Sequence, residues 1–223
     1  MGELSRGHEF LQRLLEARRL ISPVEEAGAG NGYPVVAIGV VARTYTDLDG
    51  VDDAQLAAQA ILSSDLATPI FRQMANFGLG ILAVIAGDPA EAKQHYDALI
   101  PTQGTLFSPA CMSTDRILGL LAQTMSDPQA AVGHFQDALV FCRKAGYQPE
   151  LAWTCCDYAD ALAVRSGQDD RKKIRDLLDE ALDISTKLGM RPLMERVSKR
   201  LEWVDSKPGS AASLPRWSIS ARG

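Results

Sequence analysis

The chain contains few of the residues on which catalysis, metal binding and disulfide frameworks depend. Its 223 residues include three histidines and four cysteines, and the cysteines form no Cys-x-x-Cys pair. A disulfide scaffold is therefore not expected. No Gly-x-Ser-x-Gly, His-Glu-x-x-His or Walker pattern occurs, so neither a hydrolytic triad nor a nucleotide-binding loop is expected. We predict no catalytic residue, no cofactor and no metal, and hence a protein that is not an enzyme.

Long apolar runs and an excess of positive charge are also missing. No uninterrupted apolar stretch reaches the ~18 residues that a membrane span requires. The first ten residues lack the apolar centre of a signal peptide. The net charge of −5 disfavours direct contact with nucleic acid, whose phosphates need a basic face. We therefore expect a cytoplasmic protein with neither a membrane segment nor a nucleic-acid partner.

What the chain does contain favours helices. Hydrophobic residues make up 46% of it, of which only a small part is aromatic, and alanine and leucine recur throughout. Both residues enter a helix at low cost, and alanine lets two helices approach closely. Composition therefore predicts an all-α protein.

An internal repeat organises the middle of the chain, where two segments align without gaps. Both share a Leu-Gly pair, an Ala twelve residues after the Gly and an aromatic residue four further on. They read Leu79-Gly80, Ala92, Tyr96 and then Leu118-Gly119, Ala131, Phe135, with Ala138 after it. This resembles the tetratricopeptide pattern, in which each repeat is a helix pair. The resemblance implies a right-handed superhelical solenoid of antiparallel helix pairs.

Each repeated position has a physical role. The Gly and the Ala remove side chains where the first helix of a pair (helix A) meets the second (helix B). The aromatic residue fills the space between that pair and the next. The turns Gly87-Asp88-Pro89 and Ser126-Asp127-Pro128 predict helix starts, because the carboxylate caps free N–H groups and Pro suits the first turn.

Weaker copies extend the repeat on both sides. Leu151, Cys155, Tyr158, Ala159 and Leu162 form one helical stripe, and a partner helix carries Ile174, Leu177, Leu178, Ala181, Leu182 and Leu188. Before the repeat, Leu56, Ala57, Ala60 and Ile61 indicate another helix. The run at 34–41 looks like a buried strand by composition, but the repeat register favours a helix there.

The ends of the chain differ from the repeats. We expect a helix and Gly-rich connector over 1–32, a repeat domain of about four helix pairs and a capping helix over 33–204, and a disordered tail over 205–223. The capping helix should present Arg196, Lys199 and Arg200 as its polar exterior.

Four features suggest chemistry but have simpler explanations. The Gly28–Gly32 cluster lacks the third Gly of a dinucleotide fingerprint. The acidic cluster, which comprises Asp47, Asp49, Asp52 and Asp53, departs from the EF-hand pattern and suits a capped turn. His95 and His134 are repeat-equivalent, and no further metal ligand is evident. In the Cys155-Cys156 pair the first residue belongs to the core stripe, where Cys acts as a small hydrophobe.

A partner would bind the inner curve, which helices A line in such a solenoid. Trp153, Asp157 and Asp160 share the face opposite the core stripe of their helix, and an outward Trp beside carboxylates suits a binding anchor. We assign Phe77 and Arg116 to the same inner face. The two middle A helices are apolar nearly all round, with Phe77, Ile81 and Val84, then Ile117 and Leu120. They are either packed on several sides or line an apolar trough that a peptide, another domain or a second copy covers.

The stretch over 149–196 contains Glu-Leu-Ala-Trp-Thr-Cys-Cys-Asp-Tyr-Ala-Asp-Ala-Leu, Leu-Leu-Asp-Glu-Ala-Leu and Leu-Gly-Met-Arg-Pro-Leu-Met-Glu-Arg. It resembles the C-terminal repeats of bacterial regulators with an NTPase domain of the LuxR or MalT type, and those of ATPase-linked adenylate and guanylate cyclases. The resemblance spans about 33–204 and implies a module that senses a partner or inducer. The Walker loop, the cyclase domain and the helix-turn-helix of those proteins are absent, so their activities are not carried over.

These observations predict a non-enzymatic protein-interaction or scaffold module in bacterial signal transduction or transcriptional regulation. Its partner is expected to be a protein or peptide in the concave groove, and a homodimer is possible. Two alternatives stay open. One is a small-molecule sensor domain, and the other is the regulatory fragment of a cyclase or NTPase regulator.

Overall fold

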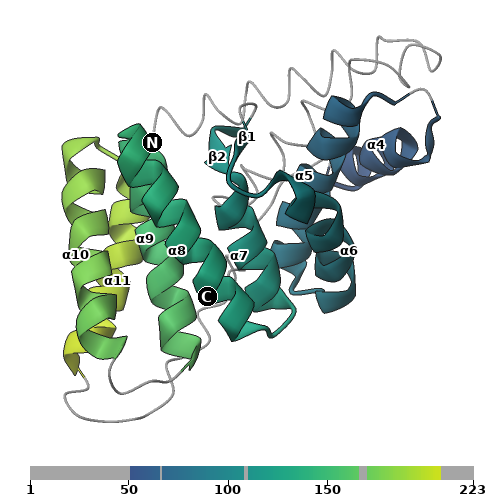
Figure 1. Ribbon diagram of the computed structural model, residues 1–223. Coiled ribbons are helices and arrows are strands. Elements are labelled where there is room, and N and C mark those ends of the chain that lie inside the picture. Colours follow the sequence, from purple (N-terminus) through teal and green to yellow (C-terminus); the bar gives the residue numbers. More distant parts are fainter. Residues whose placement is uncertain (1–50, 66, 108–109, 166–169, 207–223) are drawn as a thin grey trace. The chain divides into compact units, whose positions relative to one another are not determined.

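A computed structural model describes residues 51–65, 67–107, 110–165 and 170–206. Most of these residues lie in eight α-helices, which confirms the expected all-α class at that level (Figure 1). The only strands in these ranges form one antiparallel pair of two residues each. The predicted helix and connector over 1–32, the strand-like run at 34–41 and all but the first two residues of the predicted tail lie outside the described residues.

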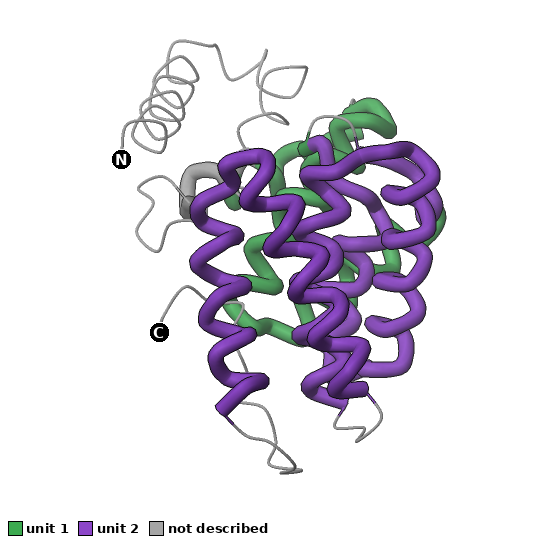
Figure 2. The backbone as a smooth tube through the Cα atoms, turned by 90° about the vertical axis from the view of Figure 1, so that its left-hand side faces the viewer, with its two compact units in different colours: residues 1–101, 108–110, 219–223 green, residues 102–107, 111–218 purple. Residues whose placement is uncertain are grey.

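The chain divides into two compact units, which Figure 2 colours separately. Unit 1 contains three described α-helices, α4 (Val51–Ser63), α5 (Pro69–Ala86) and α6 (Pro89–Leu99), which the short 3-10 turn η1 (Ile100–Thr102) follows. Unit 2 contains β1 (Leu106–Phe107), β2 (Met112–Ser113), α7 (Thr114–Thr124), α8 (Pro128–Ala145), α9 (Gln148–Arg165), α10 (Asp170–Lys187) and α11 (Arg191–Ser206).

In unit 1, α5 and α6 form the first predicted helix pair. The α5 helix ends at Gly87, whose φ of +68° is the left-handed conformation that glycine adopts without strain. Asp88 then caps α6, because its Oδ1 accepts the N–H groups of Ala90 and Glu91 at 2.9 and 3.1 Å, and Pro89 follows. The predicted Asp-Pro helix start is therefore confirmed at this turn.

The α5 helix is the most apolar element in the described residues. By length and composition it could cross a membrane, and it is the one described helix that could. More than half of it is buried within the fold, and Met74, Phe77 and Ile81 have at most 1% of their surface exposed. Such burial is typical of a core helix. In α4 the predicted Ile61 is buried together with Ala58, whereas the predicted Leu56 and Ala60 are exposed.

In unit 2, α7 and α8 form the second predicted pair and follow the same rules. Asp127 Oδ1 accepts the Ala130 N–H at 3.0 Å and Pro128 begins α8, so this cap is confirmed as well. Ser126 has a φ of +62°, the left-handed conformation that Gly87 holds in the other pair. The two turns thus share a left-handed residue at the same position, although a side chain makes that conformation more costly at Ser126 than at Gly87.

The close approach of helices A and B is visible at Gly119. A Cβ atom added there would lie 2.8 Å from Cε1 of Phe135, so the ring of helix B occupies the space that the missing side chain leaves. The Phe135 ring also stacks on Tyr158 of α9, with centroids 6.1 Å apart. The two predicted roles, close nesting at Gly and an aromatic link to the next pair, are confirmed for this repeat. The equivalent Tyr96 in unit 1 is only half-buried.

Helices α7 to α11 pack in chain order, each against the next. The predicted stripe of α9 is buried throughout, as are Ile174, Leu177, Leu178 and Ala181 of α10. Leu182 is only half-buried, and Leu188 lies beyond the end of α10 and is exposed. The hairpin of β1 and β2 precedes this series and was not predicted. Phe107 and Met112 are its buried pair, and the Thr114 N–H donates to the Thr105 carbonyl at 2.9 Å. We call α7, α9 and α11 the A helices of unit 2, because they occupy the first position in the predicted scheme of helix pairs.

Candidate functional site

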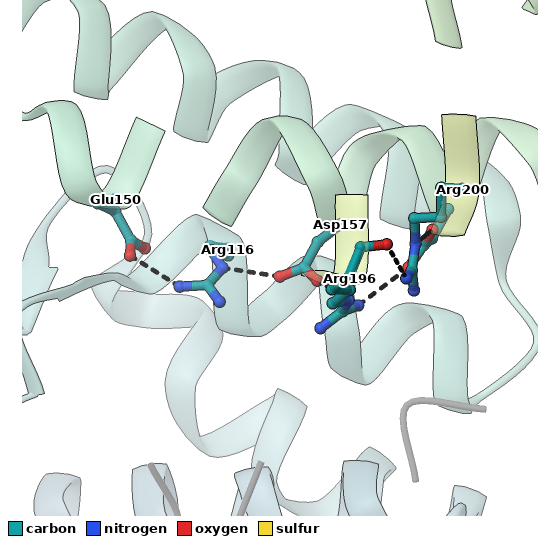
Figure 3. Close-up of polar contacts among 6 residues, drawn as sticks. Arg116, Glu150, Asp157, Arg196 and Arg200 are labelled. Atoms are coloured by element: carbon teal, nitrogen blue, oxygen red, sulfur yellow. Dashed lines mark hydrogen bonds and ion pairs between the residues drawn. The ribbon is translucent and has the colours of Figure 1, made fainter. Parts of the chain in front are cut away.

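Six ionisable side chains form a row across the three A helices of unit 2. We call it the ion-pair row, and it consists of Arg116 on α7, Glu150, Asp157 and Asp160 on α9, and Arg196 and Arg200 on α11. Figure 3 shows Glu150, Arg116, Asp157, Arg196 and Arg200 in sequence along it. Three arginines meet three carboxylates, so the formal charges balance.

Arg116 connects α7 to α9 at two points. Its Nη1 donates to Glu150 Oε2 at 2.7 Å and its Nε donates to Asp157 Oδ2 at 2.8 Å. Glu150 also accepts the Ser113 N–H at the start of α7, at 2.8 Å. All three charged side chains are at least 96% buried. Buried charges of this kind are tolerated because each one has an ionised partner and further hydrogen bonds.

Asp157 and Asp160 connect α9 to α11. Arg196 Nη2 donates to both carboxylates, at 2.9 Å in each case. Arg200 holds Asp160 with two parallel bonds, from Nε at 2.5 Å and from Nη2 at 2.6 Å. This fork-to-carboxylate geometry fixes orientation as well as charge, and lysine could not reproduce it. Asp157 is thus shared between an arginine of α7 and an arginine of α11.

The surroundings of Arg116 and Arg196 favour the charged form of both guanidinium groups. Burial acts to lower the pKa of Arg116, but the attraction of Glu150 and Asp157 outweighs it and raises that pKa. The pKa of Arg196 is likewise raised, since burial is opposed there by Cys156, Asp157 and Asp160. Burial raises the pKa of Glu150, while Arg116 and the Ser113 N–H act in the opposite direction.

Trp153 lies beside the row on α9 and is half-buried. The guanidinium carbons of Arg116 and Arg196 are 5.4 and 5.8 Å from its ring centroid, which is within the range of a cation–π contact. The aromatic side chain that the sequence suggested as a binding anchor is therefore already in contact with two arginines of its own chain.

The structure brings four of the five predicted partner-binding residues together. Asp157, Asp160 and Arg116 belong to the ion-pair row and Trp153 lies beside it, whereas Phe77 lies in unit 1 and is fully buried. The expectation that the two aspartates lie on an open face is wrong, because only 1% and 6% of their surfaces are exposed. They are buried because α7 and α11 both direct arginines at this side of α9.

Arg196 and Arg200 also differ from expectation. They were predicted on the polar exterior of a capping helix, but both are directed at α9, and Arg200 lies on the buried stripe of α11 with Leu193, Val197 and Val204. Sequence reasoning missed these two residues and Glu150 as members of a site. A signal was present: Arg116–Asp157, Asp157–Arg196 and Asp160–Arg200 are 41, 39 and 40 residues apart, close to the repeat length.

The apolar side chains that the sequence placed on the middle A helices are buried. Ile81 and Val84 in unit 1 and Ile117 and Leu120 in unit 2 have at most 2% of their surface exposed. Of the two explanations left open, packing on several sides accounts for these residues.

The remaining titratable candidates have separate surroundings. His95 Nδ1 lies 3.0 Å from Asn76 Oδ1, and His134 Nδ1 lies 3.6 Å from Asp115 Oδ1. Burial lowers the pKa of His95, which opposes a charged form. In the part of the chain that the structure describes, no three His, Cys, Asp or Glu side chains are grouped as metal ligands. Asp47 and Asp49 of the acidic cluster lie outside that part.

Three cysteines are buried in unit 2. Burial raises the pKa of Cys142 and of Cys156 to about 11, and it raises that of Cys155 as well. A thiol with a raised pKa is a poor nucleophile. Cys155 contacts Glu180, as expected of a packed side chain at the α9–α10 boundary.

Comparison with known proteins identifies no relative: no family model, no curated protein and no solved structure matches the chain.

Proposed function

We propose that the chain is a non-enzymatic protein-interaction module of the tetratricopeptide-like solenoid type, which recognises a protein or peptide through the A helices α7, α9 and α11. The proposal rests on the helix pairs with their capped Asp-Pro turns and on the close approach at Gly119. Stacked helix pairs are used as scaffolds because their inner helices present one continuous surface.

The ion-pair row is the observation that carries this proposal. It joins three successive A helices through buried or partly buried bonds of 2.5–2.9 Å, so the side chains around it are held at fixed spacing. A binding surface benefits from such rigidity, since little conformational entropy is lost when a partner binds. Trp153 lies beside the row and keeps part of its surface exposed, which suits an aromatic contact for a partner.

The biological setting of the proposal comes from the sequence resemblance alone. The C-terminal repeats of LuxR- or MalT-type regulators and of ATPase-linked cyclases imply a role in bacterial signal transduction or transcriptional regulation, in the cytoplasm. A catalytic or NTP-binding partner encoded by a neighbouring gene would favour the regulatory-fragment alternative.

A small-molecule sensor is the second candidate, and it was motivated by the apolar A helices. The burial of Ile81, Val84, Ile117 and Leu120 gives it less support than the interaction proposal has. Thermal-shift measurements with metabolite pools test it directly, because a ligand that binds only the folded state raises the unfolding temperature.

Replacement of Trp153 tests the interaction proposal. Trp153→Ala in the full chain should reduce capture of a cross-linked protein partner from native cells about tenfold or more, as hot-spot aromatics do. It should lower the free energy of unfolding by only about 1–2 kcal/mol, since two cation–π contacts are lost.

Tyr96→Ala is the matched control, because Tyr96 is also a half-buried aromatic residue but lies in unit 1. Capture should be unchanged in this variant. Equal capture by wild type and Trp153→Ala would contradict the proposal.

A further inference from the structure

The last A helix, α11, carries charge where its packing calls for an apolar residue. Its buried residues Leu193, Val197, Arg200 and Val204 recur at helical spacing, and the third of them is an arginine. Replacing a buried ion pair with apolar side chains is often neutral or stabilising, so the pair is weak evidence of a device for stability. A helix attached through ion pairs can instead be exchanged for another that offers the same charges.

The attachment of α11 is divided between two neighbours. It packs on α10, where Arg175 also pairs with Asp205, and its side-chain hydrogen bonds to α9 come from Arg196 and Arg200. Both cations of Asp160 come from α11, whereas Asp157 also holds Arg116. Within the described residues, Arg196 Nε is buried with no hydrogen-bond partner, so the row leaves one donor unsatisfied.

The two arginines of α11 cover a negatively charged part of the ion-pair row. Without α11, the row consists of Arg116, Glu150, Asp157 and Asp160, and this one cation and three carboxylates have a formal charge of −2. The two arginines of α11 supply +2. An incoming helix would therefore need two positive charges with one helical turn between them, which is the spacing of Arg196 and Arg200.

The connection between α10 and α11 is a short turn that belongs to neither helix. Gly189 has a φ of +67° and terminates α10, where Met190 N–H donates to the Ser185 carbonyl at 2.8 Å. Pro192 lies in the first turn of α11 and needs no N–H partner there. The end of α10 and the start of α11 thus have separate local signals, so a rotation of α11 about the turn at residues 188–190 would leave both helices intact.

We propose that α11 occupies, within its own chain, the docking site for an amphipathic helix of another protein that carries two arginines four residues apart, with apolar residues on the same face. Trp153, Asp157 and Asp160 of α9 form the site, and α11 acts as its internal competitor. The inference rests on the proposed interaction function and specifies the partner and its regulation. A partner helix binds only the fraction of molecules in which α11 has moved away.

A labelled peptide with the sequence of residues 191–206 is the probe, and the full-length chain is the receptor. Wild type should bind it weakly, because α11 competes at high effective concentration. The variant Arg196→Gln/Arg200→Gln should bind about tenfold tighter or more, since its internal helix is weakened. Adding Asp160→Asn should remove that gain, and a peptide with both arginines replaced by glutamine should not bind.

Arg143→Gln/Lys144→Gln is the matched receptor control, because it removes two positive charges from an exposed part of α8. It should bind the peptide as wild type does. Equal peptide affinity for wild type and Arg196→Gln/Arg200→Gln, with the latter shown to be folded by circular dichroism, would overturn the proposal. A dimer of the variant and wild-type chains with the same charge dependence would overturn the assignment to another protein.

Hydrogen exchange of the wild-type chain provides a test that needs no variant to fold. Saturating peptide should speed exchange in residues 191–206 of the chain, while the glutamine peptide should not. Unchanged exchange at saturation would also overturn the proposal. Failure of the peptide tests, with capture of a partner still dependent on Trp153, would contradict only this inference. Binding of the peptide without capture of any protein would contradict the proposed function instead.

Discussion

Two glycines of the second helix pair differ in what surrounds them, and a matched pair of substitutions exploits that difference. Gly119→Ala places a Cβ 2.8 Å from the Phe135 ring and should lower the free energy of unfolding by about 1–3 kcal/mol, as overpacking does. Gly133 lies in α8 with nothing within 4 Å of an added Cβ. Gly133→Ala should therefore raise stability by up to about 1 kcal/mol, because alanine favours the helix.

Urea unfolding of both variants measures the difference. Similar midpoints for the two alanine variants would show that the Gly119 contact relaxes without cost.

The arginines of unit 2 differ in burial, and so should the cost of removing them. Arg116→Gln leaves Glu150 and Asp157 buried beside a neutral side chain and should cost about 3–5 kcal/mol of unfolding free energy. Arg143 pairs with Glu180 at 2.7 Å, but its side chain is 52% exposed. Arg143→Gln should cost less than about 1 kcal/mol, since water replaces the partner.

Chemical denaturation of both variants at pH 7 tests this ordering. A loss at Arg116 as small as that at Arg143 would mean that water enters the ion-pair row.

Residue chemistry predicted some members of the site but not how they pair. The Trp and the aspartates of α9 stood out in the sequence because they lie off the apolar stripe. The partners of the aspartates, Arg196 and Arg200, are about 40 residues later on α11. Local pattern places such residues on the solvent side, since a helical period shows only which residues are apolar. A contact at one repeat length becomes visible only when helices in successive repeats are placed side by side.

At the scale of elements, the aspartate that caps the start of α8 should contribute measurably to stability. Asp127→Ala removes the acceptor for the Ala130 N–H and should cost about 1 kcal/mol. Asp137 is exposed near the middle of the same helix, so Asp137→Ala should leave stability unchanged or slightly higher. Thermal unfolding followed by circular dichroism compares them, and equal midpoints would show that the cap contributes nothing.

Helix pairs were predictable because their signals are local. Each signal spans only a few residues, whether it is the Leu-Gly pair, the Ala and aromatic positions or an Asp-Pro helix start. Helices α5 to α8 agree with these signals.

The hairpin at 106–113 was missed because a two-residue strand has no period to detect. The face of α4 was predicted only in part, since Ile61 is buried as expected but Leu56 is 63% exposed and Ala58 is buried. Small alanines on two faces of a helix leave its orientation undecided by sequence.

At the scale of the whole chain, the four cysteines report on folding. Cys111 is exposed, whereas Cys142, Cys155 and Cys156 are fully buried and their pKa values are raised. One thiol should react quickly with a disulfide reagent at pH 8 in the native chain, and four should react in denaturant. Cys111→Ser should abolish the fast reaction. Fast reaction of two or more thiols would show that unit 2 opens readily.

The same thiols should lower the free energy of unfolding at high pH. Folding raises the pKa of Cys142 and Cys156 from 9.0 to about 11, so the folded state holds protons that the unfolded state loses first. Their contribution is therefore constant below pH 9 and falls as the pH rises from there toward 11. Urea midpoints at pH 8 and pH 10.5 measure the decrease.

The ion-pair row also bears on how unit 2 folds. Its salt bridges join residues 34 to 41 apart in sequence, so each closes a loop of about one helix pair and none spans the whole unit. Loop closure then costs nearly the same entropy at each step, and no single long-range encounter limits the rate. We expect folding to begin at one helix pair and to propagate to its neighbours, so that Asp157 joins the two steps by accepting Arg116 in one and Arg196 in the other.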